Sequence, residues 1–262
     1  MSIWSLFLLL PAAPSILAQS LKLPPLSRLE EARIIAFSKK GKPRWKADLR
    51  IESVTLGGRE KLKFTEKGRG RFSGFKGEVR WETDSIWGGE ESLLPERMER
   101  RFYDLQGKLL SMEITEIDLQ SHTARFERQT LRKKRRTMVG SFNLPLQTFV
   151  MSGFPMALRG YPFASGGTVN FLFLSNEPKL YRANVQLKKK EAIQTLSGRH
   201  YCYKLEMKVD LGMLNLFRPF IPKIYFWFEV EKPHHFVAYS GLEDGRGTPK
   251  IRIEMVGNPR SK

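Results

Sequence analysis

Strict alternation between apolar and charged side chains marks the stretch Trp45-Lys46-Ala47-Asp48-Leu49-Arg50-Ile51. Successive side chains of a β-strand point to opposite faces, so this pattern predicts a strand with one buried face and one wet face. Gly57-Gly58 is a turn signal, and Leu62 and Phe64 resume the alternation after it. The segment therefore predicts the first two strands of an antiparallel sheet.

The same period of two continues along most of the chain, with turn signals at distances typical of an antiparallel meander. Further strands are predicted at Glu78–Thr83, Glu96–Asp104, Leu109–Asp118, Thr123–Gln129, Val169–Leu174, Tyr181–Leu187, Tyr201–Val209, Ile224–Val230, Phe236–Ser240 and Ile251–Val256. Gln106-Gly107 is a good hairpin turn, and the four glycines within Lys67–Gly77 predict a flexible turn.

Two segments depart from this period. Ser27-Arg28-Leu29-Glu30 has the form of a capping box, in which Ser27 and Glu30 each satisfy a backbone amide of the other. Apolar residues then fall near one helical face until Gly41 and Pro43, which predicts a helix from Arg28 to Lys39.

The second departure is Leu144–Leu158, where Leu, Phe and Met cluster and one or two short helices are predicted, interrupted around Gly153 and Pro155. We therefore expect a mainly β protein. Its core is a single large antiparallel curved sheet, an open or half-closed barrel, with an N-terminal helix and a short central helical insertion.

Charge is the unusual feature of the composition. The 262 residues are 41% hydrophobic and 27% charged, which is ordinary for a globular protein and unlike a polytopic membrane protein. The 45 Lys and Arg residues against 27 Asp and Glu give a net charge of +18. This excess favours polyanionic partners such as phospholipid head groups, acidic glycans or nucleic acid, and it says nothing about the fold.

The amino-terminal segment indicates export. Ser5–Ala18 is apolar and uncharged but too short to span a bilayer comfortably, since a helix needs roughly 20 apolar residues for that. Ala18-Gln19-Ser20 follows it as a small-x-small cleavage sequence. We expect residues 1–20 to be a signal peptide, cut after Ser20 or alternatively after Ala18. Residues 21–262 then form a single β-rich domain in the periplasm, and an uncleaved anchor or a buried terminus is the other interpretation. No cysteine lies near the cleavage site, so a lipoprotein is not expected.

A resemblance emerges in the second half of the chain. Glu191-Ala192-Ile193-Gln194-Thr195-Leu196-Ser197-Gly198 fits an E-x-x-x-T-x-x-G signature between two strands, and Phe226-Trp227-Phe228 and Phe236–Gly241 fit the closing strands. Over roughly Gly140–Val256 the chain resembles a domain-of-unknown-function family of exported bacterial proteins. Such families are similar in architecture to the periplasmic lipoprotein carriers LolA and LolB, whose open β-barrel holds acyl chains on an aromatic concave face under a helical lid. The resemblance implies a fold and, by analogy alone, hydrophobic-ligand binding.

Catalysis, metal binding and cofactor binding are not expected. His234 and His235 are neighbours near a strand and point to opposite faces, while His122 and His200 have no Cys or carboxylate at ligand spacing. Cys202 is the single cysteine, so no intramolecular disulfide exists, and a small structural thiol is the favoured interpretation. Nucleophile-elbow, zincin, phosphate-loop and dinucleotide-binding motifs are absent from the sequence.

Two basic clusters are candidate contacts to an anionic surface. They are Arg132, Lys133, Lys134, Arg135 and Arg136, and Lys188, Lys189 and Lys190. We expect both at strand ends or in hairpin loops, either as ordinary solvated charge or against an anionic membrane surface or acidic envelope polymer. Nucleic acid is not expected, because no binding motif accompanies the charge.

Aromatic residues are the candidate ligand-binding set. They are Phe149, Phe154, Phe171, Phe173, Tyr181, Tyr201, Tyr203, Phe226 and Phe228. They either line the concavity of a curved sheet or fill a closed core. The first case predicts a non-catalytic binding module for a lipid or another hydrophobic or anionic envelope ligand. The second predicts a structural or assembly factor of the cell envelope that contacts a protein or acidic polysaccharide and has no ligand cavity. The ligand and the oligomeric state stay open.

Overall fold

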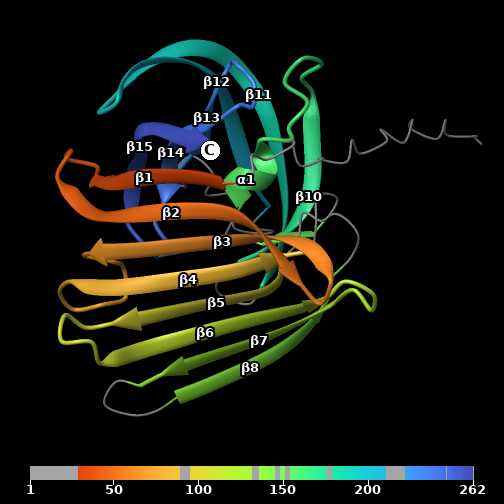
Figure 1. Ribbon diagram of the computed structural model, residues 1–262. Helices are drawn as coiled ribbons and strands as arrows, with labels where there is room; N and C mark the ends of the chain where they lie inside the picture. The colour runs from red at the N-terminus through yellow and green to blue at the C-terminus, as the bar shows by residue number, and fades with distance from the viewer. Residues whose placement is uncertain are drawn as a thin grey trace, which may run out of the picture.

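The computed structural model describes residues 29–88, 95–131, 136–144, 148–150, 154–175, 179–210, 222–245 and 247–261. These residues form fifteen strands and one short helix (Figure 1). The elements are β1 (Leu29–Ser38), β2 (Pro43–Leu56), β3 (Arg59–Gly70), β4 (Val79–Trp87), β5 (Pro95–Tyr103), β6 (Leu109–Asp118), β7 (Thr123–Thr130), β8 (Arg136–Asn143), β9 (Thr148–Val150), α1 (Phe154–Leu158), β10 (Thr168–Leu174), β11 (Leu180–Thr195), β12 (Gly198–Val209), β13 (Ile224–Glu229), β14 (Phe236–Leu242) and β15 (Lys250–Ser261). The described part of the chain contains no helix long and apolar enough to cross a membrane.

All fifteen strands belong to one sheet, in the order β8-β7-β6-β5-β4-β3-β2-β1-β15-β14-β13-β12-β11-β10-β9. The sheet consists of two meanders, and pairing of β1 with β15 joins them in the middle. Neighbouring strands are antiparallel except for β9 and β10, which run parallel. The strands curve around α1, and the sheet is not closed into a barrel (Figure 1). We call the face that carries α1 the inner face.

The predicted period of two is confirmed in the strands. In β2, Trp45, Ala47 and Ile51 are buried, and β4 alternates in the same way over its whole length. The expected flexible turn at Lys67–Gly77 is wrong in its first residues, because β3 continues to Gly70. The physical reason is packing: a Cβ on Gly68 would lie 2.0 Å from the Trp81 ring, so this glycine makes room for a buried indole.

The predicted N-terminal helix is wrong. Residues 29–38 form β1, which is hydrogen-bonded to β2 on one side and to β15 on the other. Burial alternates along it, with Glu30, Ile34 and Ala36 buried. Tertiary pairing on both edges outweighs the local helical signal.

The predicted central helical insertion is also wrong. Within Leu144–Leu158 the described residues form the three-residue strand β9 and the five-residue helix α1. The chain then leaves the helix through tight turns, in which the amides of Arg159, Gly160 and Tyr161 donate to the carbonyls three residues earlier.

We call Phe154–Phe163 the plug. Ala157, Leu158, Tyr161 and Phe163 pack into a hydrophobic cluster with β10–β13, whereas Met156 packs against Ile51, Phe64 and Trp87 of β2–β4. The plug therefore contacts both meanders. A separate buried cluster, which includes Trp45, Trp81 and Phe102, packs against Phe72 of the loop between β3 and β4.

A buried ion pair fixes the plug to the centre of the sheet. Arg159 Nη1 and Nη2 donate to the Glu30 carboxylate at 2.8 and 3.2 Å, and Arg159 Nε donates to the Pro233 carbonyl at 3.3 Å. Both Glu30 and Arg159 are buried. Glu30, expected as a helix-capping residue, is thus the anchor of the plug on β1.

Removing one partner of this pair should strongly destabilise the fold. Arg159→Met leaves the Glu30 carboxylate buried without its cation, so we expect a loss of about 3 kcal/mol in the free energy of unfolding. Urea denaturation measures this. The double variant Glu30→Gln/Arg159→Met should lose less than the sum of the single variants. The exposed pair Arg33–Asp48 is the control, and Arg33→Gln should leave the free energy of unfolding essentially unchanged. Equal effects of Arg159→Met and Arg33→Gln would contradict this role.

Candidate functional site

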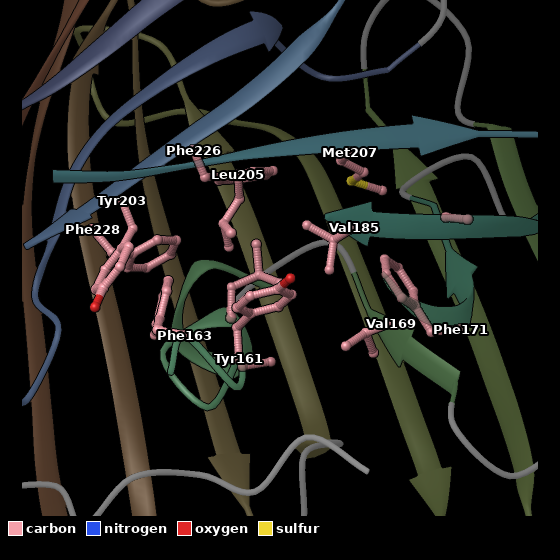
Figure 2. Close-up of a cluster of buried hydrophobic side chains, with 13 residues drawn as sticks. Tyr161, Phe163, Val169, Phe171, Val185, Tyr203, Leu205, Met207, Phe226 and Phe228 are labelled. Carbon is pink, nitrogen blue, oxygen red and sulfur yellow. The ribbon is translucent and has the colours of Figure 1, made fainter. Parts of the chain in front are cut away.

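The inner face of the second meander carries a cluster of aromatic and aliphatic side chains. Its buried members are Ala157, Leu158, Tyr161, Phe163, Val169, Phe171, Ala183, Val185, Tyr203, Leu205, Met207, Phe226 and Phe228 (Figure 2). They come from β10–β13 and from the plug. We call this the aromatic cluster.

The structure brings five of the nine candidate aromatic residues together here. Phe171, Tyr203, Phe226 and Phe228 belong to the aromatic cluster, and Tyr181 is partly buried against it. Tyr201 does not join them, because it is 59% exposed near the end of the β11–β12 hairpin. The side chains of Phe149, Phe154 and Phe173 lie outside the described residues.

The plug covers this cluster directly. The Phe163 ring stacks on Tyr203 with centroids 4.6 Å apart and also lies 5.9 Å from Phe228. The Tyr161 hydroxyl donates to the Gly167 carbonyl and accepts from the Leu187 amide at 3.0 Å. Figure 2 shows both plug rings extending from their loop toward the β12 and β13 side chains. The predicted aromatic inner face therefore exists, and side chains of the same protein occupy it.

A second, charged group of residues lies on the inner face of the first meander, together with Asp244 from the segment that follows β14. We call Glu66, Arg100, Glu113, Arg128 and Asp244 the charged cluster. Arg100 and Arg128 each lie opposite Glu113 on neighbouring strands, so the three side chains share one face. Arg100 donates to Glu113 at 2.6 and 2.9 Å and to Asp244 at 3.2 Å, and Arg128 Nε lies 2.7 Å from Glu113.

The charged cluster adjoins apolar rings. The Arg100 guanidinium lies 5.0 Å from the Phe102 centroid and 5.8 Å from that of Phe72. Burial works against its charge, but Asp244 and Glu113 together raise the Arg100 pKa above its ordinary value. Burial raises the pKa of Glu66, which opposes ionisation although the Trp81 indole donates to it. Buried charged groups with shifted pKa values often mark functional sites, although structural ion pairs produce them too.

Sequence reasoning missed the charged cluster. The only available signal was the strand period, which places Arg100 on the same face as Phe102. The neighbouring Arg97 and Arg101 look equivalent in sequence, and nothing distinguishes an inward arginine from an outward one until the face of Phe102 is known to be buried.

The lysine triplet lies elsewhere than expected. Lys188, Lys189 and Lys190 are inside β11 rather than in a loop, and the register of β11 against β12 shifts between Leu187 and Lys189. Lys188 lies 3.5 Å from Glu206, Lys189 lies 2.7 Å from Glu191, and the Lys190 ammonium lies 5.0 Å from the Tyr203 ring centroid. The register shift at Lys188 is a bulge-like irregularity, and it changes the local alternation of side chains where three consecutive lysines occur in one strand.

The other basic cluster is mostly beyond what the structure describes. Arg132, Lys133, Lys134 and Arg135 lie outside the described residues. Arg136 opens β8, so it does not belong to a loop, and its side chain is not described.

The signature residues of the second half build structure. Glu191 accepts hydrogen bonds from Lys189, Trp227 and Lys204, which outweigh the effect of burial and lower its pKa to about 2. Thr195 is buried in the turn between β11 and β12, and Gly198 has a φ of +120°, which only glycine adopts readily. The E-x-x-x-T-x-x-G signature therefore specifies a hairpin.

Cys202 is a buried thiol, and His200 links a serine to a carboxylate. Burial together with the carboxylates of Glu229 and Glu191 raises the Cys202 pKa to about 12. His200 Nε2 lies 2.9 Å from the Ser197 hydroxyl and Nδ1 lies 3.2 Å from Glu229, so the three side chains form the serine, histidine and carboxylate order that is also found in hydrolases. The Ser197 hydroxyl is also within hydrogen-bond distance of the Met255 carbonyl, and His234 packs on Phe163. Among the described residues, no three His, Cys, Asp or Glu side chains are grouped so that they could hold a metal ion.

Cys202 should be chemically inert in the folded protein. Because the thiolate is the reactive form and the thiol is buried, we expect a maleimide to label the native protein at neutral pH far more slowly than the urea-unfolded protein. Mass spectrometry of the adduct measures this. Equal rates in the two states would contradict the buried, protonated thiol. Cys202→Ser should fold normally with at most a modest loss of stability.

No protein-family model and no curated protein matches the chain. Solved structures align with it at low similarity. One, from Bacteroides fragilis, is provisionally classed as an exported protein with a YmcC-like fold; it is 11% identical, with a TM-score of 0.30, over 92% of this chain and 99% of that one. A second, provisionally classed as a lipoprotein of Parabacteroides distasonis, is 8% identical with a TM-score of 0.30, over 91% of this chain and 97% of that one. The Aeromonas veronii immune modulator A is 8% identical with a TM-score of 0.16, over 90% and 97% of the two chains. One exported protein and one lipoprotein are thus among the similar structures, at scores too low to carry an argument.

Proposed function

We propose that this protein is a non-catalytic binding module of the bacterial cell envelope that holds a lipid acyl chain on its aromatic cluster. The observation that carries the proposal is the plug. Among the described residues, one short segment covers the strongly apolar face of β10–β13, and neither a second sheet nor a long helix does.

The construction of the plug makes it displaceable. Isolated helices shorter than about 12 residues are marginal in water, so the five-residue α1 depends on its side-chain contacts. Those contacts are the apolar packing of Leu158, Tyr161 and Phe163 and the ion pair of Arg159 with Glu30, so displacement here means that the apolar side chains leave the sheet while Arg159 stays paired. A flexible apolar chain offers the sheet equivalent packing, so it competes with the plug for the same face.

The charged cluster suits an amphipathic ligand. It lies on the same inner face as the aromatic side chains, and its two arginines provide donors of the kind that carboxylate and phosphate groups prefer. The resemblance to the periplasmic lipoprotein carriers supports the same class of ligand by analogy.

Export to the periplasm, by a signal peptide cut after Ser20, and the absence of a lipid anchor belong to this proposal, because residues 1–28 lie outside the described part.

The alternative is an assembly factor in which the plug never leaves. The packing of Phe163 on Tyr203 and Phe228 favours this alternative as long as nothing displaces the plug. Displacement by an acyl chain is therefore the property that separates the two functions.

The test is titration of the protein with cis-parinaric acid, a long-chain fatty acid that fluoresces in apolar surroundings. We expect binding by the parent protein and about tenfold tighter binding by Phe163→Ala, because a weaker plug raises the population of the open form. Phe163→Leu, which keeps most of the packing, should lie between them and covers the case in which the alanine variant folds poorly.

Phe37→Ala is the matched control. Phe37 follows the buried Ala36 in β1, so its side chain points to the opposite face of the sheet. We expect this variant to bind the fatty acid as the parent does. The acyl-binding proposal would be rejected if neither the parent nor the two Phe163 variants bound the fatty acid. It would also be rejected if Phe37→Ala gained as much affinity as Phe163→Ala.

A further inference from the structure

The β11–β12 hairpin ends in an exposed apolar tip. We call Ala192–Tyr201 the hairpin tip. Leu196, at its apex, and Tyr201 are each 59% exposed, the highest values among the large hydrophobic side chains of the described residues. Single exposed apolar residues are common on proteins and do not by themselves indicate a contact surface.

Hydrogen bonds to β15 hold the turn at the apex of the hairpin in place. The Leu196 amide donates to the Glu254 carboxylate at 3.0 Å, and the Ser197 hydroxyl donates to the Met255 carbonyl at 3.1 Å, so two bonds tie the turn to β15. Inside the turn, the Thr195 hydroxyl contacts both Ser197 and Gly198. A network of partly buried polar groups thus fixes the position of Leu196, although its exposed side chain contributes little burial of apolar area to the fold.

The charge around the tip has one sign on its exposed side. Residues 192–201 contain Arg199 and no carboxylate. Arg199 is exposed, and so is Lys190, which lies two residues before Ala192 and opposite Tyr203. Two carboxylates contact the tip: Glu254, which is buried and paired with Arg252 at 2.7 Å, and Glu229, which is partly buried and lies 3.2 Å from His200 Nδ1. An approaching surface therefore meets apolar side chains and cations.

We propose that the hairpin tip docks on an anionic lipid surface, with Leu196 and Tyr201 entering the head-group region and Arg199 and Lys190 facing the phosphates. Apolar insertion and electrostatic attraction add in such contacts, and each basic residue near the lipids contributes favourably. An acidic protein surface would use the same cations but would not need an exposed leucine at the apex. The inference is independent of the acyl-binding proposal, because the tip and the aromatic cluster use different side chains.

A polarity-sensitive probe at the apex tests this directly. Leu196→Cys is labelled with a nitrobenzoxadiazole dye, and the buried native thiol of Cys202 is replaced by serine in the same protein. We expect a blue shift and a rise in emission with vesicles containing phosphatidylglycerol, and a much smaller response with pure phosphatidylcholine vesicles. The matched control is Leu105→Cys, since Leu105 is also an exposed leucine, in the turn between β5 and β6. Its dye should not respond.

Vesicle sedimentation without any dye gives the second readout. Leu196→Ser/Tyr201→Ser should bind phosphatidylglycerol vesicles about tenfold more weakly than the parent, as expected from losing buried apolar area. Arg199→Gln should weaken binding mainly at low salt. Leu105→Ser should bind as the parent does, and all these variants should take up cis-parinaric acid unchanged in the absence of vesicles.

Three results would overturn the proposal. They are a Leu196 dye that stays in a polar environment with anionic vesicles, equal responses at Leu196 and Leu105, and undiminished vesicle binding by Leu196→Ser/Tyr201→Ser. Failure of fatty-acid uptake in every variant, with vesicle binding intact, would reject the acyl site and leave the docking tip in place.

Discussion

A curved sheet has an inner face that must be kept from water, and in this protein that requirement governs the rest of the structure. Pairing of β1 with β15 merges two meanders into one continuous sheet, so one inner face extends across both, apolar over β10–β13 and partly charged in the first meander. Compact folds bury such a face against another layer of secondary structure. Among the described residues, the plug packs on β10–β13 through Phe163 and on β2–β4 through Met156. Phe72, in the loop between β3 and β4, packs on Trp45, Trp81 and Phe102 in a separate cluster.

Buried charge is the second element of this arrangement. The ion pair of Glu30 and Arg159 attaches the plug at the junction of the two meanders, and the charged cluster around Arg100 lies farther along the same face. Buried ion pairs add little net stability compared with apolar packing, so their value lies in specifying one arrangement. Burial and the nearby Arg159 lower the pKa of His235, which keeps another positive charge away from the anchor.

The alternation of apolar and polar residues was sufficient to predict most strands. It was insufficient where a helical pattern and a strand pattern overlapped in the same segment. Alternation predicted β2, β4 and β6 because their faces differ in polarity. It failed in β1, where Glu30 occupies an inward position that only the distant Arg159 makes acceptable. The conformation of the plug could not be predicted for a related reason, since it depends on contacts with both meanders. Of the candidate site, the aromatic side chains of β12 and β13 were predictable, whereas the charged cluster and the irregularity at Lys188 depend on register.

The central claim is that the plug and an acyl chain exclude each other from the inner face. Hydrogen exchange of residues 154–163, followed by mass spectrometry with and without bound oleate, measures this most directly. The amides of Arg159, Gly160 and Tyr161 are bonded within the plug in the unliganded protein. We expect saturating oleate to accelerate their exchange, while exchange in β2 and β4 stays unchanged. Oleate binding that leaves exchange in the plug unchanged, or slows it, would contradict the account.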